Sequence, residues 1–286
     1  MTITVGDIRK AARAGLIKAG TTFREDQFAA YRRAIDAESR PNARWVMEQA
    51  VENARIAEKE KLPLCDDTGI PHVIARVGDA CELPAGWMTA VRQGVMDGLR
   101  EMPGRPMAVQ GDDVERMEQS GGLDPDPAAL ELAPVIVHPA RGAALELTVL
   151  LLGGGPEIRA RTRRIFHRRS IDTILKEVSG WFAEEVGSLG CTPAVAAVGI
   201  GRSHVEASAM MLEAMATGSL ERQSDLERKV TREINNTGVG PLGLGGNTTA
   251  LGCFLKIGPA RASGVRIVCA RPCCLHEPRR ATLVLP

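Results

Sequence analysis

Apolar residues recur at helical spacing through the beginning of the chain, and this pattern constrains the fold more than any other feature. Ile8, Ala12 and Leu16 would line one face of a helix, and Pro41 separates two later helical segments. Downstream, helical patterns alternate with short β-rich runs, and no repeat or low-complexity linker divides them. We therefore expect a mixed α+β fold, with N-terminal helices and short strands, in a single domain over residues 1–286.

The later elements follow from periodicity and from turn residues. A polar segment rich in proline, glycine and aspartate, 103–132, is expected to form a long loop. The basic stretch 159–169 is interpreted as the solvated face of a helix, with an anion site as the alternative. We expect helices at 85–102, 170–189 and twice within 204–236, and strands at 72–78, within 190–201 and from 250 onward, with a hairpin of two strands inside 133–157.

The charge balance and the scarcity of aromatic residues exclude two classes of partner. The chain has 36 basic and 35 acidic residues, a formal charge of +1, so no global field favours nucleic acid or an anionic membrane. Aromatic residues make up 3%, which argues against a surface for base stacking.

No stretch is apolar enough to span a bilayer, and the first residues lack the apolar core of a secretory signal. We expect a cytoplasmic protein.

Seven cysteines are the strongest chemical signal in the sequence. An odd number without a secretory signal argues against a disulfide framework and favours metal ligation or catalysis. Cys65 and Cys191 each lie where an apolar run gives way to a loop. Cys269, Cys273 and Cys274 lie on or just after a strand near residue 270. Because neighbours on extended backbone point in different directions, at most one of Cys273 and Cys274 would reach a given metal.

Cysteines on three separate segments do not match a zinc ribbon or a ferredoxin, which use short C-x-x-C pairs. Three thiolates can instead bind three irons of a cubane cluster and leave the fourth iron open as a Lewis acid. The alternative is a thiol protein in which Cys273 and Cys274 carry out redox chemistry and Cys65 is an ordinary core residue.

Two glycine-rich segments suit a small anion. The run 235–252 ends in Asn247, Thr248 and Thr249, so backbone amides and hydroxyls could converge on a carboxylate or phosphate. It lacks the lysine and the spacing of a P-loop. The segment 153–157 offers a similar backbone approach, and tight structural turns are the alternative for both.

Together these motifs resemble the α subunit of the iron–sulfur hydro-lyases that include class I fumarase and L-tartrate dehydratase. The family pattern C-Q-D-T-G matches 65–69, and K-G-G-G-S-E resembles "LGGGPE" at 152–157. The family's C-P-P with a following apolar strand and G-I-G resembles 191–201. Its G-x-G-L-G-G-x-T-T resembles 240–249. The order and spacing agree over most of the chain.

The resemblance implies the fold of that α subunit and a [4Fe-4S] cluster held by three cysteines. It assigns the first ligand to Cys65 and the second to Cys191. The third normally follows a strand and precedes a pair of basic residues, which favours Cys274. Cys273 and Cys269 remain alternatives.

The resemblance also implies roles in catalysis and substrate binding. Asp67 falls on the family's active-site aspartate, an acid–base group or a residue that orients a substrate hydroxyl. Arg105 resembles an arginine that binds a carboxylate, which a guanidinium can hold with two hydrogen bonds. The other positions expected to contact substrate are Asp66, Gly154, Gly245 and Thr248.

The function implied is addition or removal of water across a carbon–carbon double bond in a small dicarboxylate. A separate β subunit would complete a hetero-oligomer. Several family residues are replaced: Asp66 stands for a glutamine, Leu152 for a lysine, Pro156 for a serine and Arg261 for a histidine, and the N-T-G-D-N segment is not recognisable within 110–132. These departures leave a non-catalytic cluster-binding or assembly protein of the same fold as the alternative.

Overall fold

The computed structural model describes residues 2–286, which form two compact units interleaved along the chain. Unit 1 consists of Met1–Thr22, Ala54–Gly153 and Arg279–Pro286, of which residue 1 lies outside the described residues. Unit 2 consists of Phe23–Asn53 and Gly154–Pro278. Each unit has its own mixed sheet and its own apolar core. The mixed α+β class is therefore confirmed, whereas the expectation of one domain over residues 1–286 stays a prediction.

The helices expected at the start of the chain are confirmed as α1 (Val5–Thr21), α2 (Glu25–Ala37) and α3 (Pro41–Glu60). Helix α1 begins with a capping box, in which the Thr4 side chain accepts from the Asp7 amide and the Asp7 carboxylate accepts from the Thr4 amide. Proline at the first position of α3 costs no hydrogen bond, because that amide has no partner within a helix.

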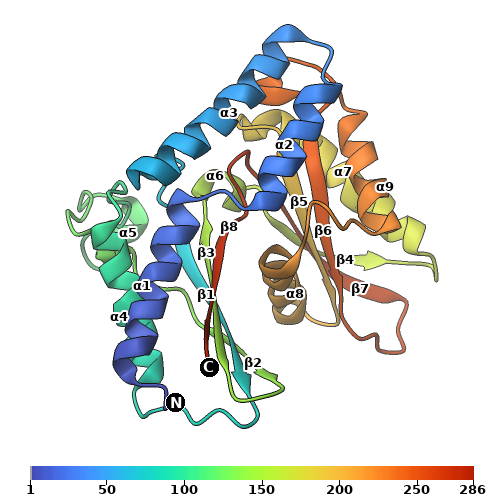
Figure 1. The fold of residues 1–286 in the computed structure, drawn as a ribbon. Coiled ribbons are helices and arrows are strands. Elements are labelled where there is room, and N and C mark those ends of the chain that lie inside the picture. The colour runs from blue at the N-terminus through green and yellow to red at the C-terminus, as the bar shows by residue number, and fades with distance from the viewer. Residues whose placement is uncertain (1) are drawn as a thin grey trace. The chain divides into compact units, whose positions relative to one another are not determined.

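Unit 1 is built on a four-stranded sheet in the order β2-β1-β3-β8. Its strands are β1 (Ile70–Gly78), β2 (Ile136–Ala140), β3 (Leu145–Leu152) and β8 (Arg279–Leu285). Helices α1 and α4 (Trp87–Glu101) lie side by side against this sheet, as Figure 1 shows. Their buried apolar side chains and those of β1 and β3 form the core of the unit.

The prediction of a hairpin within 133–157 is wrong. Both runs are strands, but β1 lies between them, parallel to β2 and antiparallel to β3. Strand β3 is mostly apolar, apart from Glu146 and Thr148, and nearly all of its side chains are buried, so it suits a central position with a neighbour on each side. Strand β2 is only half buried and contains Pro139, which cannot donate to a ladder and suits an edge.

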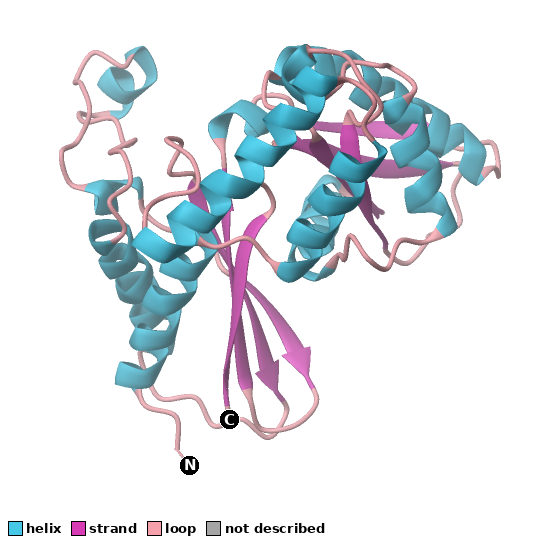
Figure 2. Ribbon diagram, turned by 45° about the horizontal axis from the view of Figure 1, so that its top comes forward, coloured by secondary structure: helices cyan, strands magenta, loops and turns pink. Residues whose placement is uncertain are grey.

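Unit 2 is built on a second sheet in the order β4-β7-β5-β6. Its strands are β4 (Arg161–Phe166), β5 (Ala194–Gly201), β6 (Ala250–Ile257) and β7 (Val265–Cys273). Helix α8 (His204–Thr217) covers one face, and α7 (Ile171–Leu189) and α9 (Asp225–Asn235) cover the other (Figures 1 and 2). Every residue of β5 is buried as a result.

The prediction that the basic stretch 159–169 forms a helix face is wrong. Most of this stretch forms the edge strand β4. Arg161 forms ion pairs with Glu184 and Glu185 of α7, and the Arg163 guanidinium lies 5.4 Å from the centre of the Trp181 ring. The arginines of β4, of which Arg163 and Arg164 are exposed, fit an edge, where charge discourages pairing with another chain.

The expected loop at 103–132 is largely irregular. It holds one short helix, α5 (Asp113–Glu118), and a 3-10 turn, η1 (Pro127–Leu130). Two more short turns lie in the glycine-rich segments, α6 (Gly154–Glu157) and η2 (Pro241–Gly243). Among residues 2–286, no helix combines the length and the apolar character that crossing a bilayer requires.

The packing of α4 on α1 depends on a missing side chain, and we predict a loss of stability when one is added. A Cβ at Gly94 would lie 2.3 Å from the Arg9 carbonyl oxygen and 2.8 Å from the Ala12 Cβ. Gly94→Ala should therefore lower the free energy of unfolding by about 1–3 kcal/mol. The matched control is Gly180→Ala in α7, where no atom lies within 4 Å and alanine should stabilise the helix by about 0.5–1 kcal/mol. Thermal unfolding followed by circular dichroism measures both, and equal melting temperatures would contradict this packing.

Candidate active site

The loop that carries Cys65 joins α3 to β1 in unit 1 and is shaped by a buried arginine. The Arg279 side chain is 2% exposed, and its Nη1 donates to the carbonyl oxygens of Asp67 at 2.6 Å and Thr68 at 3.3 Å. Gly69 has φ +81°, and a Cβ there would lie 2.4 Å from Arg279 Nη2. Glycine is therefore needed for both the backbone conformation and the space.

Four residues predicted from the sequence come together around this loop, namely Cys65, Asp66, Asp67 and Arg105. The Asp67 carboxylate accepts from the Gly69 amide at 3.0 Å, which fixes its orientation. Asp66 is exposed and lies 3.6 Å from Arg105 Nη1. The Thr68 hydroxyl donates to the Arg105 carbonyl oxygen at 2.7 Å, which holds the arginine segment against the loop. Because the ion pair of Asp66 and Arg105 is exposed, it is weak enough to exchange for a ligand carboxylate.

The Cys65 thiol is partly shielded from solvent, and its neighbours act on it in opposite directions. Burial raises the pKa of the thiol above its ordinary value. The Asp67 amide and the Arg279 charge act to lower this pKa, whereas the Asp66 carboxylate acts to raise it. Metal coordination would favour the thiolate in the same sense as Arg279.

Cys191 and Cys274 come together in unit 2, at one end of its sheet. Cys191 precedes β5 and Cys274 follows β7, and these two strands are antiparallel neighbours. The Leu275 amide donates to the Cys191 carbonyl oxygen at 2.9 Å, which joins the two segments. Cys191 is exposed and Cys274 half-buried.

Tyr31 of α2 lies beneath this pair. Its side chain is fully buried, and its hydroxyl donates to the Leu275 carbonyl oxygen at 2.7 Å. Burial raises the pKa of Tyr31 well above its ordinary value, and charge at Cys274 and at Cys191 raises it further. The hydroxyl therefore stays protonated and keeps its hydrogen bond to Leu275.

The two alternatives to Cys274 lie on β7 with their side chains buried. Cys273 is 0% exposed, and burial raises its pKa to about 12. The Nη1 of Arg271 donates to its sulfur at 3.3 Å. Cys269 is 4% exposed. The different burial of Cys273 and Cys274 fits the extended backbone and favours Cys274, whose role as a ligand stays a prediction.

The turn that carries Cys274 is anchored by a buried ion pair. The guanidinium of Arg271 contacts Glu277 at 2.6 Å and Glu157 of α6 at 2.9 Å. The Glu277 amide donates to the Cys274 carbonyl oxygen at 2.9 Å and closes the turn. The same arginine thus positions the segment after Cys274 and the short helix that begins at Gly154.

The glycine-rich loop of unit 2 binds a carboxylate of the chain itself. Glu38, which is 1% exposed, accepts from the Asn247 amide at 2.9 Å. A Cβ at Gly246 would lie 2.7 Å from a carboxylate oxygen of Glu38, and one at Gly245 would lie 2.5 Å from Arg40 Nη1. These glycines therefore admit two charged side chains from the end of α2, which no pattern in the sequence indicates.

The hydroxyls of this loop act partly within it. The Thr249 hydroxyl accepts from the Gly240 amide at 3.0 Å, and the Thr192 hydroxyl donates to the Gly240 carbonyl oxygen at 2.6 Å. The loop is thereby tied to the residue that follows Cys191. Thr248 is buried at 8% exposure, and its contact with substrate, like that of Gly245 and Gly154, stays a prediction.

Arg261, where the resemblance leads us to expect a histidine, lies far from these cysteines within unit 2. It belongs to the connection between β6 and β7, at the Gly201 end of β5. Cys191 and Cys274 lie at the Ala194 end. The side chain of residue 261 is therefore not part of the surroundings of either thiol.

The thiols suit iron by their chemistry, because sulfur ligands select iron–sulfur clusters and other soft metals. Cys65 belongs to unit 1, and Cys191 and Cys274 belong to unit 2. Among residues 2–286, no three His, Cys, Asp or Glu side chains are grouped so that they could hold a metal ion. The ligand set therefore stays a prediction.

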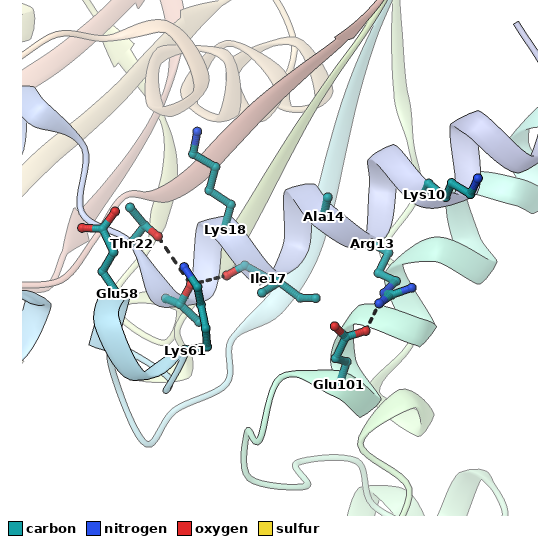
Figure 3. Close-up of a pocket in the computed structure, with 10 residues that line it drawn as sticks. Lys10, Arg13, Ala14, Ile17, Lys18, Thr22, Glu58, Lys61 and Glu101 are labelled. Atoms are coloured by element: carbon teal, nitrogen blue, oxygen red, sulfur yellow. Dashed lines mark hydrogen bonds and ion pairs between the residues drawn. The ribbon is translucent and has the colours of Figure 1, made fainter. Parts of the chain in front are cut away.

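A separate cavity of about 410 Å³ lies along α1 in unit 1 (Figure 3). Lys10, Lys18 and Lys61 line it, and Arg13 is paired with Glu101 at its edge. None of the site residues expected from the sequence lines this cavity. Flexible lysines at an open surface do not make a defined site, so the cavity adds nothing to the candidate active site.

Differences in thiol burial predict an order of alkylation in protein freed of iron by a chelator. Cys191 should react with iodoacetamide first at about pH 8, because it is exposed. Cys253, Cys269 and Cys273 should stay unmodified until the protein unfolds, since their side chains are buried. Peptide mapping by tandem mass spectrometry measures each site. Modification of Cys273 as fast as Cys274 would show that the turn after β7 differs from the one described.

Comparison with known proteins identifies the family to which this chain belongs. Residues 9–284 match the family described as fumarate hydratase (Fumerase). The chain is 28% identical over 241 residues to the "Putative L(+)-tartrate dehydratase subunit alpha" of Methanocaldococcus jannaschii, a match that covers 82% of each chain. It is 24% identical over 258 residues to the L(+)-tartrate dehydratase subunit alpha of Escherichia coli O157:H7, covering 87% of this chain and 81% of the relative. Because the family match spans nearly all of its residues, the protein belongs to the fumarate hydratase (Fumerase) family and is an enzyme of the hydro-lyase class.

Proposed function

We propose that this protein is the α subunit of a [4Fe-4S]-dependent hydro-lyase that reversibly hydrates or dehydrates a small dicarboxylate of the fumarate or tartrate type. The observation that carries the proposal is the Cys65 loop, where a thiol, two carboxylates and the Arg105 guanidinium meet on a support provided by Arg279. This combination offers a soft metal ligand, a proton-transfer group and a carboxylate partner within one short segment.

Assembly with a separate β subunit, in a hetero-oligomer, is part of the proposal. Its support is the naming of the relatives as alpha subunits. We also propose a cytoplasmic location. Its support is the odd number of cysteines, seven, which does not suit a disulfide framework and fits a reducing compartment.

Cys65, Cys191 and Cys274 would hold the cluster. When bound, it supplies an open iron that acts as a Lewis acid on substrate oxygens. Cys191 and Cys274 project from adjacent segments joined by the bond from Leu275 to Cys191. Tyr31 keeps that junction fixed from below through the Leu275 carbonyl oxygen.

The protein's own residues would bind and orient the substrate. Arg105 would exchange its exposed contact with Asp66 for a substrate carboxylate, and Asp66 would contact the substrate at the rim. Asp67, held by the Gly69 amide, would move a proton or orient a hydroxyl. Backbone at Gly154 and Gly245 and the hydroxyl of Thr248 would complete the binding groups.

We predict that iron binding depends on three of the seven cysteines. Protein prepared without oxygen should contain about four irons and four sulfides, as a [4Fe-4S] cluster requires. The cluster should be lost in each of Cys65→Ala, Cys191→Ala and Cys274→Ala, because the two thiolates that remain are too few to hold it. Iron and acid-labile sulfide analysis with an absorbance spectrum measures this.

Cys273→Ala and Cys269→Ala serve as the matched controls, since their buried side chains should leave the iron content unchanged. Loss of iron from Cys273→Ala with retention in Cys274→Ala would reassign the third ligand. Native protein that stays free of iron after anaerobic reconstitution would contradict the cluster.

We predict that Asp67→Asn lowers kcat by about 100-fold or more with the cluster spectrum intact, because the amide cannot transfer the proton. The assay uses fumarate, malate and tartrate with the α chain produced together with its β subunit. Asp66→Gln, the matched control in the same loop, should change KM more than kcat. Absence of turnover by cluster-loaded native protein on every dicarboxylate would favour the alternative, a non-catalytic cluster-binding or assembly protein.

A further inference from the structure

A second cavity, of about 340 Å³, lies in unit 2 at the opposite end of the sheet from Cys191 and Cys274. It is bounded by the turn after β4, the beginning of α7 and the connection between β6 and β7. Strands rise about 3.3 Å per residue, so the length of β5 separates this cavity from those cysteines by roughly 23 Å. The volume falls within the usual range for small-molecule sites.

The base of the cavity is a buried arginine with incomplete hydrogen bonding. Arg266 of β7 is 9% exposed, and its Nη2 donates to the carbonyl oxygens of Gly258 at 2.9 Å and Ile200 at 3.2 Å. Its Nε has no hydrogen-bond partner among residues 2–286. A buried guanidinium with an unsatisfied donor is costly, and an anion in the cavity would reduce that cost by supplying a counter-charge.

The charge around this arginine is positive. Arg169 and Arg261 line the cavity with Arg266, and no aspartate or glutamate among residues 2–286 does so. The nearby Glu206 carboxylate is engaged by Arg202, through contacts of 2.6 Å and 3.0 Å. That carboxylate also interacts with Arg266 and offsets part of the charge, but Arg169 and Arg261 leave the lining itself positive.

The amino end of α7 opens into the same cavity. Helix α7 has 19 residues, and its N-cap, Ser170, makes no side-chain capping bond. The first turn of a helix carries amides without partners and a partial positive charge, both of which favour an anion. Ser170 and Ile171 line the cavity, so this end of the helix is accessible from it.

His167 holds the polar side of the cavity in place. Its Nδ1 accepts from the Arg169 amide at 3.0 Å, so its Nε2 carries the proton and donates to the Ser263 carbonyl oxygen at 3.0 Å. The ring thus links the turn after β4 to the connection before β7. Arg168 and Arg169 have φ of 48° and 58°, a conformation that costs energy in residues other than glycine.

The opposite side is apolar. Ile174, Ile200 and Ile257 line it, and Ile257 is 47% exposed at the rim. A bare inorganic ion would leave this side in contact with water. A ligand with a short hydrocarbon part would bury it, at a gain of about 25 cal/mol for each Å² covered.

We infer that this cavity binds a compact organic oxyanion, with a carboxylate or phosphate group at Arg169, Arg261 and Arg266 and a short apolar part against the isoleucines. The site is independent of the proposed cluster and of the Cys65 loop. It uses Arg169, which belongs to the basic stretch 159–169 and lies beyond the last residue of β4.

Isothermal titration calorimetry of the full-length protein tests the inference, with butyl phosphate and butyrate as probes and butanol and inorganic phosphate as matched controls. One or both organic anions should bind, and should do so about tenfold more tightly than inorganic phosphate, whereas butanol should not bind. The comparison of the two organic anions shows which head group the arginines prefer. Absence of heat from both, up to about 10 mM, would overturn the inference.

Variants locate the binding. Arg261→Gln and Arg169→Asn change exposed side chains, and asparagine tolerates the left-handed conformation at 169, so both should fold and weaken binding by about tenfold. Arg266→Gln should abolish binding, and circular dichroism establishes whether it folds.

Two controls separate this site from others. Arg164→Gln alters the same basic stretch outside the cavity, and Arg105→Gln alters the proposed active site, so both should leave binding within about twofold. Binding that is lost in Arg105→Gln and kept in Arg261→Gln and Arg169→Asn would place the anion at the active site and overturn the inference. The failure of the proposed function would leave this result unchanged.

Discussion

The buried contact between Arg271 and Glu277 is the interaction on which the cysteine end of unit 2 depends. Both side chains are 0% exposed, and removing either partner would leave an uncompensated charge in the core at a cost of about 3–5 kcal/mol. Although burial acts to lower the pKa of Arg271, the charge of Glu277 raises it above its ordinary value, so the guanidinium stays charged. Its position fixes the turn after β7 and, through Glu157, the short helix α6.

Unit 1 uses an arginine in a comparable way. Arg279 contacts backbone carbonyl oxygens of the Cys65 loop, and Gly69 leaves the space that its guanidinium fills. In each unit a rigid, permanently charged group therefore holds the backbone near a cysteine. The cysteines themselves can remain partly exposed because they do not have to support the loop.

The sequence predicts the regular elements well, because amphipathic helices and β-rich runs carry a local signal. It also predicts that Cys65, Asp67 and Arg105 belong together. It fails where pairing is decided between distant segments. The runs around 136 and 150 look like a hairpin, yet β1 separates them, and the interleaving of the two units leaves no linker to reveal them.

Other site features have no local signal at all. Glu38 fills the glycine-rich loop from a position some two hundred residues earlier, and Tyr31 reaches Leu275 across a similar separation. The basic stretch looked like a helix face because its arginines are dense, but only the fold shows that Glu184 and Glu185 neutralise one of them. Long-range partners of this kind depend on topology, which a single sequence does not contain.

The position of Arg279 in the chain sets an order of events during synthesis. A ribosome makes Cys65, Cys191 and Cys274 before it makes Arg279, the first residue of β8. Until that residue emerges, the carbonyl oxygens of Asp67 and Thr68 lack their donor, and β3 lacks the neighbour with which it pairs in the finished sheet. The first thiol in the sequence is thus among the last to acquire its final surroundings.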